Sequence, residues 1–179
     1  LFLAGKMLEE GATVLDLGGQ SSRPGASLIG AEAELQRVIP AIEAIVKRFP
    51  DAVLSVDTFH AAVARAAVES GAHIINDIGA GMMDEKMFQT VSDLGVSYIM
   101  MHMKGTPETM QNKPEYEDIV VEVFDFLNQR VQLAREYGIY DIMLDPGFGF
   151  GKTIAQNYSL LKHLNSFELL ELPVLAGFQ

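Results

Sequence analysis

Three polar residues, each placed directly after a short apolar run, have the side chains needed to bind a flat, nitrogen-rich ring. Asp57, Asn76 and Asp145 each end a run of three or four mostly apolar residues. Carboxylates taken out of water must find hydrogen-bond donors, because an unpaired buried charge is costly, and the ring N–H groups of a heterocycle would supply them. An aspartate at the end of a strand is also a common helix N-cap, so capping stays an alternative for each aspartate taken alone.

Residues 145–153 (DPGFGFGKT) form a glycine-rich turn between a predicted strand and a predicted helix. Backbone N–H groups and a helix start at one place suit a polar or anionic ligand, and glycines let the backbone approach it closely. The stretch is not a P-loop, because Pro146 stands where the leading glycine belongs, and its evenly spaced glycines do not fit G-x-G-x-x-G. Lys152 is expected either to bind an anion or to be a solvated lysine at the helix start.

A polar loop and the end of one strand offer further candidates. In residues 20–26 (QSSRPGA) the guanidinium of Arg23 and the neighbouring serine hydroxyls suit a phosphate or carboxylate, with an ordinary surface arginine as the alternative. His102 is expected to have a structural or pocket-lining role, since no second His or Cys stands at metal-ligand spacing. Met101 and Phe150 fall at a strand end and in a loop, where an apolar platform for an aromatic ring would lie.

The composition indicates an ordinary globular protein and argues against several other classes. The 179 residues are 49% hydrophobic and 21% charged, as in ordinary globular proteins. With 13 basic and 24 acidic residues the net charge is -11, which argues against nucleic acid or an anionic membrane as the main partner. There are no cysteines, which fits a cytoplasmic location, and no apolar run long enough to span a bilayer is seen.

The elements that must position these residues alternate between strands and helices. Strands are predicted at 13–17, 53–56, 73–75, 97–101, 142–144 and 174–176. Helices are predicted at 1–10, 31–49, 61–70, 84–94, 118–137 and 156–164. Short, wholly apolar strands separated by helices indicate a parallel sheet with both faces covered. Because nearly every strand ends in a polar residue (Asp16, Asp57, Asn76, His102 and Asp145), we predict an α/β fold, a (β/α)8 TIM barrel incomplete at both ends, with residues 1–179 as one domain.

Five stretches, in order along the chain, resemble the motifs of the dihydropteroate synthase family: 15–26, 55–58, 74–78, 101–111 and 145–152. The resemblance implies a (β/α)8 barrel that belongs to folate biosynthesis. It also implies a transferase, which condenses 6-hydroxymethyl-7,8-dihydropterin pyrophosphate with 4-aminobenzoate to give 7,8-dihydropteroate. A homodimer is expected.

The resemblance also implies roles for individual residues. The residues that would bind substrate are Ser22, Arg23, Asp57, Asn76, Met101, Asp145 and Phe150. Asp57, Asp145 and Arg23 would be catalytic, the two carboxylates by stabilising the cationic pterin methylene that develops as pyrophosphate leaves. Mg2+ would accompany the pyrophosphate, with the family's metal ligand outside this chain.

Parts of the family pattern are missing or altered. The family's N-terminal asparagine-containing strand and its C-terminal Ser-Arg-Lys, Arg and His residues are not found, so we expect a fragment that would not turn over alone. Where many members have Glu-Ser-Thr-Arg, this chain has Gln20 and two serines before Arg23. Two alternatives stay open: a pterin-binding methyltetrahydrofolate methyltransferase, which needs a corrinoid partner, and a non-catalytic pterin-binding protein.

Overall fold

The computed structural model describes residues 1–21, 28–105 and 115–177. Its centre is a sheet of five parallel strands that lie side by side in the order of the sequence. The strands are β1 (Val14–Gly18), β2 (Val53–Asp57), β3 (Ile74–Asp77), β4 (Ser97–Met101) and β5 (Ile142–Asp145). The predicted parallel α/β fold is therefore confirmed.

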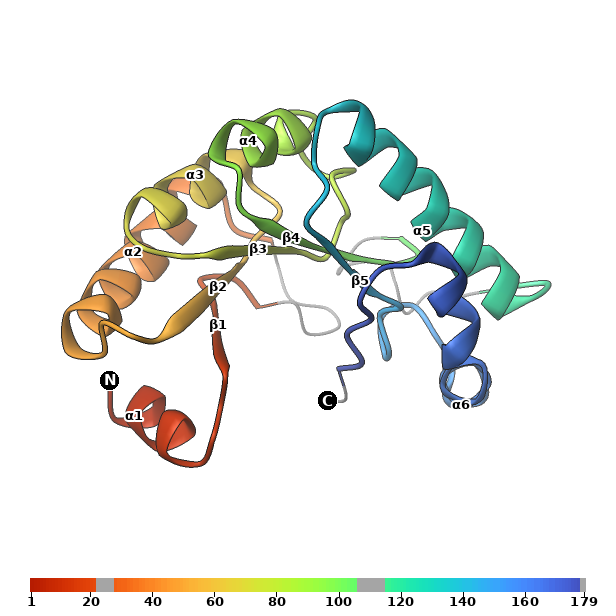
Figure 1. The fold of residues 1–179 in the computed structure, drawn as a ribbon, viewed down its shortest axis with the longest axis horizontal. Coiled ribbons are helices and arrows are strands. Elements are labelled where there is room, and N and C mark those ends of the chain that lie inside the picture. The colour runs from red at the N-terminus through yellow and green to blue at the C-terminus, as the bar shows by residue number, and fades with distance from the viewer. Residues whose placement is uncertain (22–27, 106–114, 178–179) are drawn as a thin grey trace.

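Helices lie between the strands and at both ends of the chain, and those between the strands cover one side of the curved sheet. They are α1 (Phe2–Glu9), α2 (Ala31–Arg48), α3 (Ala61–Glu69), α4 (Met87–Leu94), α5 (Ile119–Glu136), α6 (Ile154–Lys162) and the 3-10 helix η1 (Leu164–Leu170). Figure 1 shows α2, α3, α4 and α5 along the outer, convex side of the arc of strands. A doubly wound sheet would reverse its strand order and carry helices on both faces, whereas this arrangement is the wall of a barrel. Over the described residues the wall stays open.

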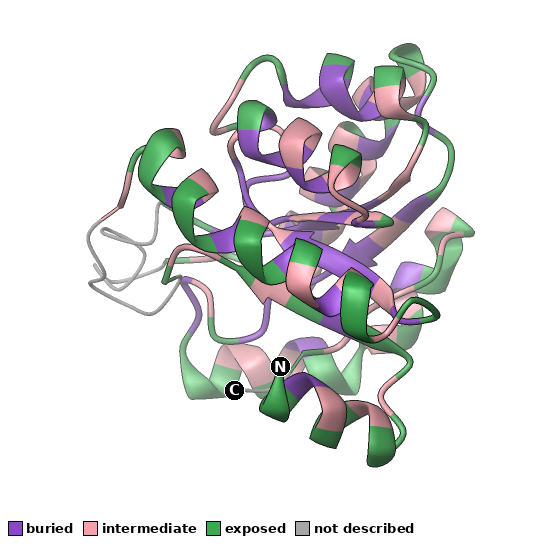
Figure 2. Ribbon diagram, turned by 90° about the vertical axis from the view of Figure 1, so that its left-hand side faces the viewer, coloured by how far each residue is buried: buried purple, intermediate pink, exposed green. Residues whose placement is uncertain are grey.

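The core lies between the sheet and these helices. Every third or fourth residue of α5 is buried, as is the corresponding stripe of α2 that includes Val38, Ile42 and Ile45. Figure 2 shows the buried residues on the helix surfaces that face the strands. These stripes match the spacing of apolar residues in the sequence, because 3.6 residues per turn bring such positions to one side of a helix.

Capping residues explain where two of the helices begin. The side chain of Asp118 accepts hydrogen bonds from the backbone N–H groups of Val120 and Val121 at the start of α5. Thr153 and Gln156 form a reciprocal capping box at the start of α6. Each bond satisfies a backbone donor that the first turn of a helix leaves without an internal partner.

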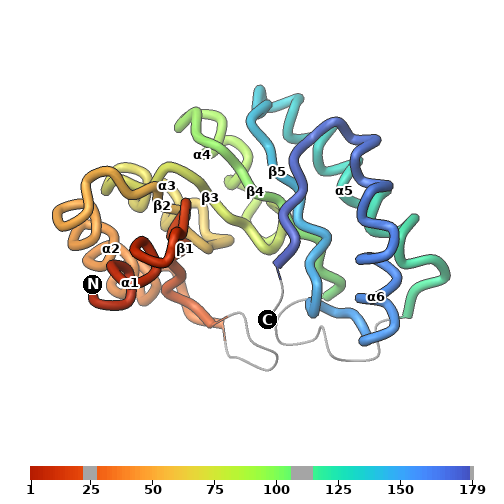
Figure 3. Tube along the Cα trace, turned by 60° about the horizontal axis from the view of Figure 1, so that its bottom comes forward, coloured from red at the N-terminus to blue at the C-terminus, as the bar shows by residue number. Residues whose placement is uncertain are grey.

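Most predicted boundaries differ from the structure by no more than two residues, and three differences are more informative. The helix predicted to begin at residue 84 begins at Met87, because the side chain of Asp84 accepts from the backbone N–H of Ala61 (2.8 Å) and so caps α3. The strand predicted at 174–176 is reduced to one parallel bridge between Val174 and Leu144, where Figure 3 shows the last described segment beside β5. Asp16, predicted to end its strand, lies in the middle of β1.

Among the described residues, none of the helices combines the length and the apolar character needed to cross a bilayer.

Candidate functional site

The register of the strands brings the polar residues of the sequence to one face of the sheet. Asp57 on β2 lies directly opposite Asn76 on β3, and Met101 on β4 lies directly opposite Asp145 on β5. Paired residues in parallel strands point to the same side, and side chains alternate along each strand. Counting along the ladders puts Asp16 on this face too. The alternate residues, such as Leu54, point towards the helices and are buried.

Asp57 and Asn76 form the part of this face nearest β1. The amide Nδ2 of Asn76 donates to Oδ2 of Asp16 (3.1 Å), which fixes the amide and leaves its carbonyl oxygen as an acceptor. Burial, together with the nearby carboxyl groups of Asp16, Glu34 and Asp77, raises the pKa of Asp57 to about 7. A carboxyl group that titrates near neutrality can both accept and donate hydrogen bonds, which suits a ring with adjacent N–H and nitrogen acceptor positions.

Asp145 lies at the other side of the same face, at the end of β5. It is 8% exposed, and its Oδ1 accepts a hydrogen bond from the backbone N–H of Gly147 (2.7 Å). Burial raises the pKa of this carboxyl to about 6, while the Gly147 N–H and the ammonium of Lys152 act in the opposite direction. Because Oδ1 is occupied by the loop, the second oxygen of Asp145 is the one that can face a ligand.

Gly147 shows why the turn after β5 needs glycine. Its φ is +71°, and a Cβ at this position would lie 2.0 Å from the carbonyl oxygen of His102. Any side chain would therefore push the loop after β5 away from the loop after β4. The close approach of these two backbones holds Asp145 beside Met101.

Both predictions for Lys152 were wrong. The residue is 7% exposed, and its Nζ donates to the carbonyl oxygens of His102 (3.1 Å), Gly147 (2.7 Å) and Phe150 (3.0 Å). Its three N–H donors are used within the protein, so it is neither solvated nor available for an anion. Burial lowers the pKa of Lys152 to about 7, against the influence of Asp145. Lys152 joins the loops that follow β4 and β5.

His102 is packed into the protein, as the structural alternative predicts. It is 5% exposed, and its ring meets Phe126 edge-on with 4.9 Å between centroids. Burial and the nearby Lys152 lower its pKa to about 3, so the imidazole is neutral at physiological pH. Among the described residues there is also no group of three His, Cys, Asp or Glu side chains arranged to hold a metal ion.

Met101 and Phe150 come together in a small apolar cluster at the carboxyl ends of the strands. The cluster contains Phe59, Ile78, Met101 and Met103, and Leu28, Met83 and Phe150 pack against it. It is separate from the main core between sheet and helices. An apolar surface beside carboxyl and amide groups is the composition expected of a site for a flat, polar ring.

Asp77 is a residue whose structural importance the sequence did not show. It follows Asn76 but points to the opposite face, where it is 1% exposed. Its carboxylate accepts from the backbone N–H groups of Gly79 and Gly81 (2.7 Å each) and from the hydroxyl of Tyr98 (2.6 Å). The glycines two and four residues later were the available signal, because an aspartate commonly bonds the backbone of the turn that follows it. Asp77 orders the turn after β3 and so steadies Asn76.

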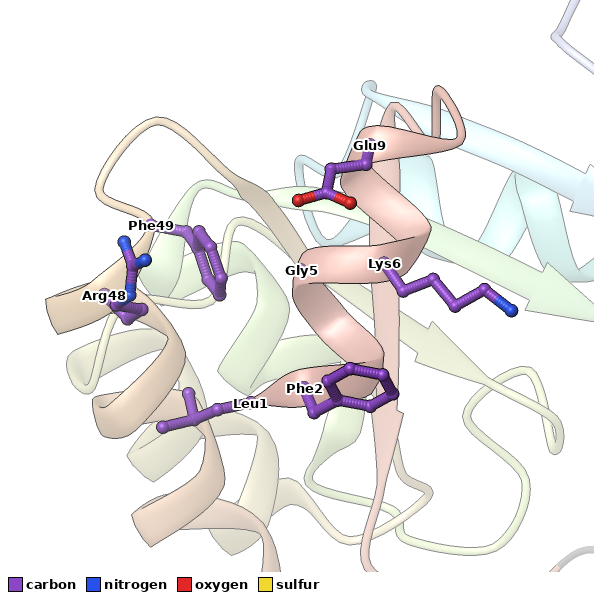
Figure 4. A pocket seen from close by; sticks show the side chains of 7 residues that line it. All are labelled: Leu1, Phe2, Gly5, Lys6, Glu9, Arg48 and Phe49. Carbon is purple, nitrogen blue, oxygen red and sulfur yellow. The ribbon is translucent and has the colours of Figure 1, made fainter.

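Two cavities outside this face contain none of the predicted site residues. One, of about 370 Å3, lies between α1 and the end of α2 and is lined by Leu1, Phe2, Gly5, Lys6, Glu9, Arg48 and Phe49 (Figure 4). Because Arg48 and Phe49 precede β2, this cavity is at the amino end of the sheet. A second, of about 780 Å3, is lined by four acidic residues together with Lys104, Tyr116, Val121 and Gln156. The predicted residues Ser22 and Arg23 lie outside the described part of the chain.

Comparisons with known proteins assign the family. The model of the family described as pterin binding enzyme matches residues 1–178. The chain belongs to this family. Among its relatives, the dihydropteroate synthase of Escherichia coli K12 is 43% identical over 176 residues, which are 97% of this chain and 62% of the relative. The chain thus spans less than two thirds of that relative's length.

Solved structures agree with this membership in the pterin binding enzymes. The Yersinia pestis dihydropteroate synthase in complex with a sulfonamide drug has a TM-score of 0.94 and 42% identity, over 98% of this chain and 64% of that one. The Xanthomonas albilineans dihydropteroate synthase with 4-aminobenzoic acid has a TM-score of 0.91 and 45% identity, over 98% of this chain and 62% of that one. The resemblance seen in the sequence motifs is therefore confirmed.

Proposed function

We propose that this chain is the pterin-binding part of a dihydropteroate synthase. The observation that carries the proposal is the shared face of Asp57, Asn76 and Asp145, bordered by the apolar pair Met101 and Phe150. The relatives and solved structures, one of them with 4-aminobenzoic acid, favour the synthase over the methyltransferase. A non-catalytic pterin-binding protein stays the second candidate, and turnover distinguishes the two.

In the proposed reaction the carboxyl groups stabilise a developing positive charge and do not act as nucleophiles. The C–O bond to pyrophosphate breaks, pyrophosphate leaves with the electron pair, and the pterin methylene carries positive charge. Asp57 and Asp145, ionised by contact with the ring N–H groups, would stabilise that charge as it develops. The amine of 4-aminobenzoate then forms the C–N bond and releases a proton. Ser22 and Arg23 would lie near the pyrophosphate and the aminobenzoate.

Mg2+, a homodimer and a cytoplasmic location stay predictions. The described residues do not offer a group of three ligands for Mg2+, so they do not fit a complete metal site, and no step above is assigned to the metal. The proposal concerns the pterin pocket, for which the described residues supply the hydrogen-bonding groups.

Titration of the chain with a dihydropterin, followed by calorimetry, tests the pocket. We expect Asp145→Asn to weaken binding about tenfold or more, since hydrogen bonds to a charged group are typically the stronger ones. Asn keeps an oxygen for the Gly147 N–H, so the loop is preserved. The matched control is Asp141→Asn, the same change just before the amino end of β5. Equal affinity in the two variants would remove Asp145 from the site.

Turnover tests the activity in the full-length protein. Labelled 4-aminobenzoate should appear in dihydropteroate, with one pyrophosphate released per product. Transfer of a methyl group to a corrinoid would instead support the methyltransferase. Pterin binding without either reaction would support the non-catalytic candidate.

A further inference from the structure

Glu34 lies in the first turn of α2, where a charged side chain would ordinarily be exposed, yet it is buried. It is 0% exposed, and neither carboxylate oxygen makes a hydrogen bond among the described residues. Burial raises the pKa of Glu34, while the Thr58 hydroxyl and His60 act in the opposite direction. The Thr58 hydroxyl forms no well-aligned hydrogen bond with either oxygen. Nε2 of His60 is 3.9 Å from Oε2, beyond hydrogen-bond distance. A carboxyl group this deeply buried needs a partner, since leaving it unpaired is costly.

Gln20 also has a buried polar group without a partner. Its Oε1 accepts a hydrogen bond from the backbone N–H of Ile29 (2.9 Å), which fixes the orientation of the amide. The amide nitrogen Nε2 is buried and has no acceptor among the described residues. The unpaired amide N–H of Gln20 and the unpaired carboxyl group of Glu34 thus line the same small cavity.

The cavity has the size of a single water molecule. Its volume is about 10 Å3, and its lining consists of Gln20, Glu34, Asp57, Thr58, Phe59 and Ile78. A buried water needs about this much room and two to four polar partners. Gln20 and Glu34 supply two of these, and Asp57, in the wall of the same cavity, supplies a third.

The surrounding backbone holds Glu34 in place. A Cβ on Gly19 would lie 2.8 Å from Cγ of Glu34 and 2.9 Å from its carbonyl oxygen, so glycine is required for this approach. One turn further along α2, Arg37 donates to the carbonyl oxygen of Gly19 (3.1 Å). The end of β1 and the start of α2 are therefore packed closely, which leaves the Glu34 side chain little freedom.

Asp57, by contrast, has nothing in the described structure that fixes its carboxylate. The charged groups that act on it are the carboxyls of Asp16 on β1, Glu34 on α2 and Asp77 on β3, and none of the described residues donates a hydrogen bond to it. Like charges do not orient a carboxylate, whereas a hydrogen-bonding water does.

We propose that Glu34 is a positioning residue for Asp57: together with Gln20 it binds one ordered water, and this water orients the Asp57 carboxylate towards the ligand face of the sheet. In this arrangement Glu34 is a neutral acid that donates to the water, and the water donates to Asp57. The proposal rests on the proposed function only in taking Asp57 as a pterin ligand.

Crystal structures of the protein and of two variants test the positioning without any ligand. We expect a water within hydrogen-bond distance of Gln20 Nε2, Glu34 and Asp57. Glu34→Gln should keep that water, since an amide N–H replaces the acid O–H. Glu34→Leu, of similar volume, should lose the water and change the Asp57 side-chain conformation. An empty cavity in the unaltered protein, or an unchanged Asp57 in Glu34→Leu, would overturn the proposal.

Dihydropterin affinity supplies the functional measurement. We expect Glu34→Leu to bind at least about fivefold more weakly, the effect of one lost hydrogen bond, while Glu34→Gln stays close to the unaltered protein. The control is Glu32→Gln, which removes a charge from the same helix turn at an exposed position. Wild-type affinity in Glu34→Leu would contradict the role of Glu34. Absence of pterin binding in every protein would contradict the proposed function and leave the crystallographic result to decide the positioning.

Discussion

The buried lysine between the two loops gives a prediction whose size can be worked out from its contacts. Lys152→Met keeps the aliphatic chain and removes the ammonium that donates to the carbonyl oxygens of His102, Gly147 and Phe150. Hydrogen bonds to a charged group contribute roughly 1.5–3 kcal/mol each, but desolvation of the ammonium, which lowers the Lys152 pKa to about 7, offsets much of this. We expect the free energy of unfolding to fall by about 2–3 kcal/mol.

Urea denaturation at pH 7, followed by circular dichroism, measures this change. The control is Lys162→Met, the same substitution in the last turn of α6 at an exposed position, where we expect a change of less than about 0.5 kcal/mol. A second measurement follows from the charge. The ammonium lowers the pKa of Asp145, so Lys152→Met should raise that pKa above its present value of about 6, which carboxyl NMR can follow.

Equal stability of Lys152→Met and Lys162→Met would contradict a stabilising role for the Lys152 ammonium. Such a result would mean that the three carbonyl groups are satisfied equally well without the lysine. If Lys152→Met loses much stability but leaves the titration of Asp145 unchanged, the role of Lys152 is to hold the two loops together, and it has no effect on the pKa of Asp145.

Two further predictions concern Asp77 and Asp57. Tyr98→Phe removes the 2.6 Å hydrogen bond to the buried Asp77 and should lower the free energy of unfolding by about 2 kcal/mol. The control Tyr140→Phe, at a residue that is 70% exposed, should change it little. Similar urea midpoints in the two variants would contradict this prediction. The pKa of Asp57 is raised from 3.8 to about 7 in the folded protein, so the native state binds the Asp57 proton more tightly than the unfolded state does. The stability that this proton binding contributes is present at low pH and is lost as the pH rises from about 4 to about 7. In Asp57→Asn we expect the urea midpoint to fall less steeply between about pH 4 and pH 7 than in the unaltered protein. Equal pH dependence of the midpoint in the two proteins would count against the raised pKa of Asp57.

Much of the fold follows from local patterns in the sequence. Short apolar runs alternating with stretches of helical period predict a parallel sheet covered by helices, and the glycines and capping residues mark most boundaries. The polar residues at the strand ends could also be named in advance, because parallel strands bring their carboxyl ends to one edge. The boundary at residue 84 failed because Asp84 caps a helix 23 residues earlier in the chain, a contact that spacing alone does not show.

Which of these residues share a face, and which side chains are buried, depends on how the strands and helices pack. Asn76 and Asp77 are adjacent in sequence, but the register of β3 places Asn76 on the face that carries Asp57 and Asp145, and Asp77 on the opposite, buried face. Lys152 contacts a carbonyl 50 residues away, and Glu34 is buried while Glu32, two residues before it, is exposed. The spacing of apolar residues along the sequence indicates helix or strand, because the backbone conformation of a segment depends largely on its own residues. Burial and the pKa values that depend on it come from segments distant in sequence, whose approach is fixed only when the sheet and helices pack.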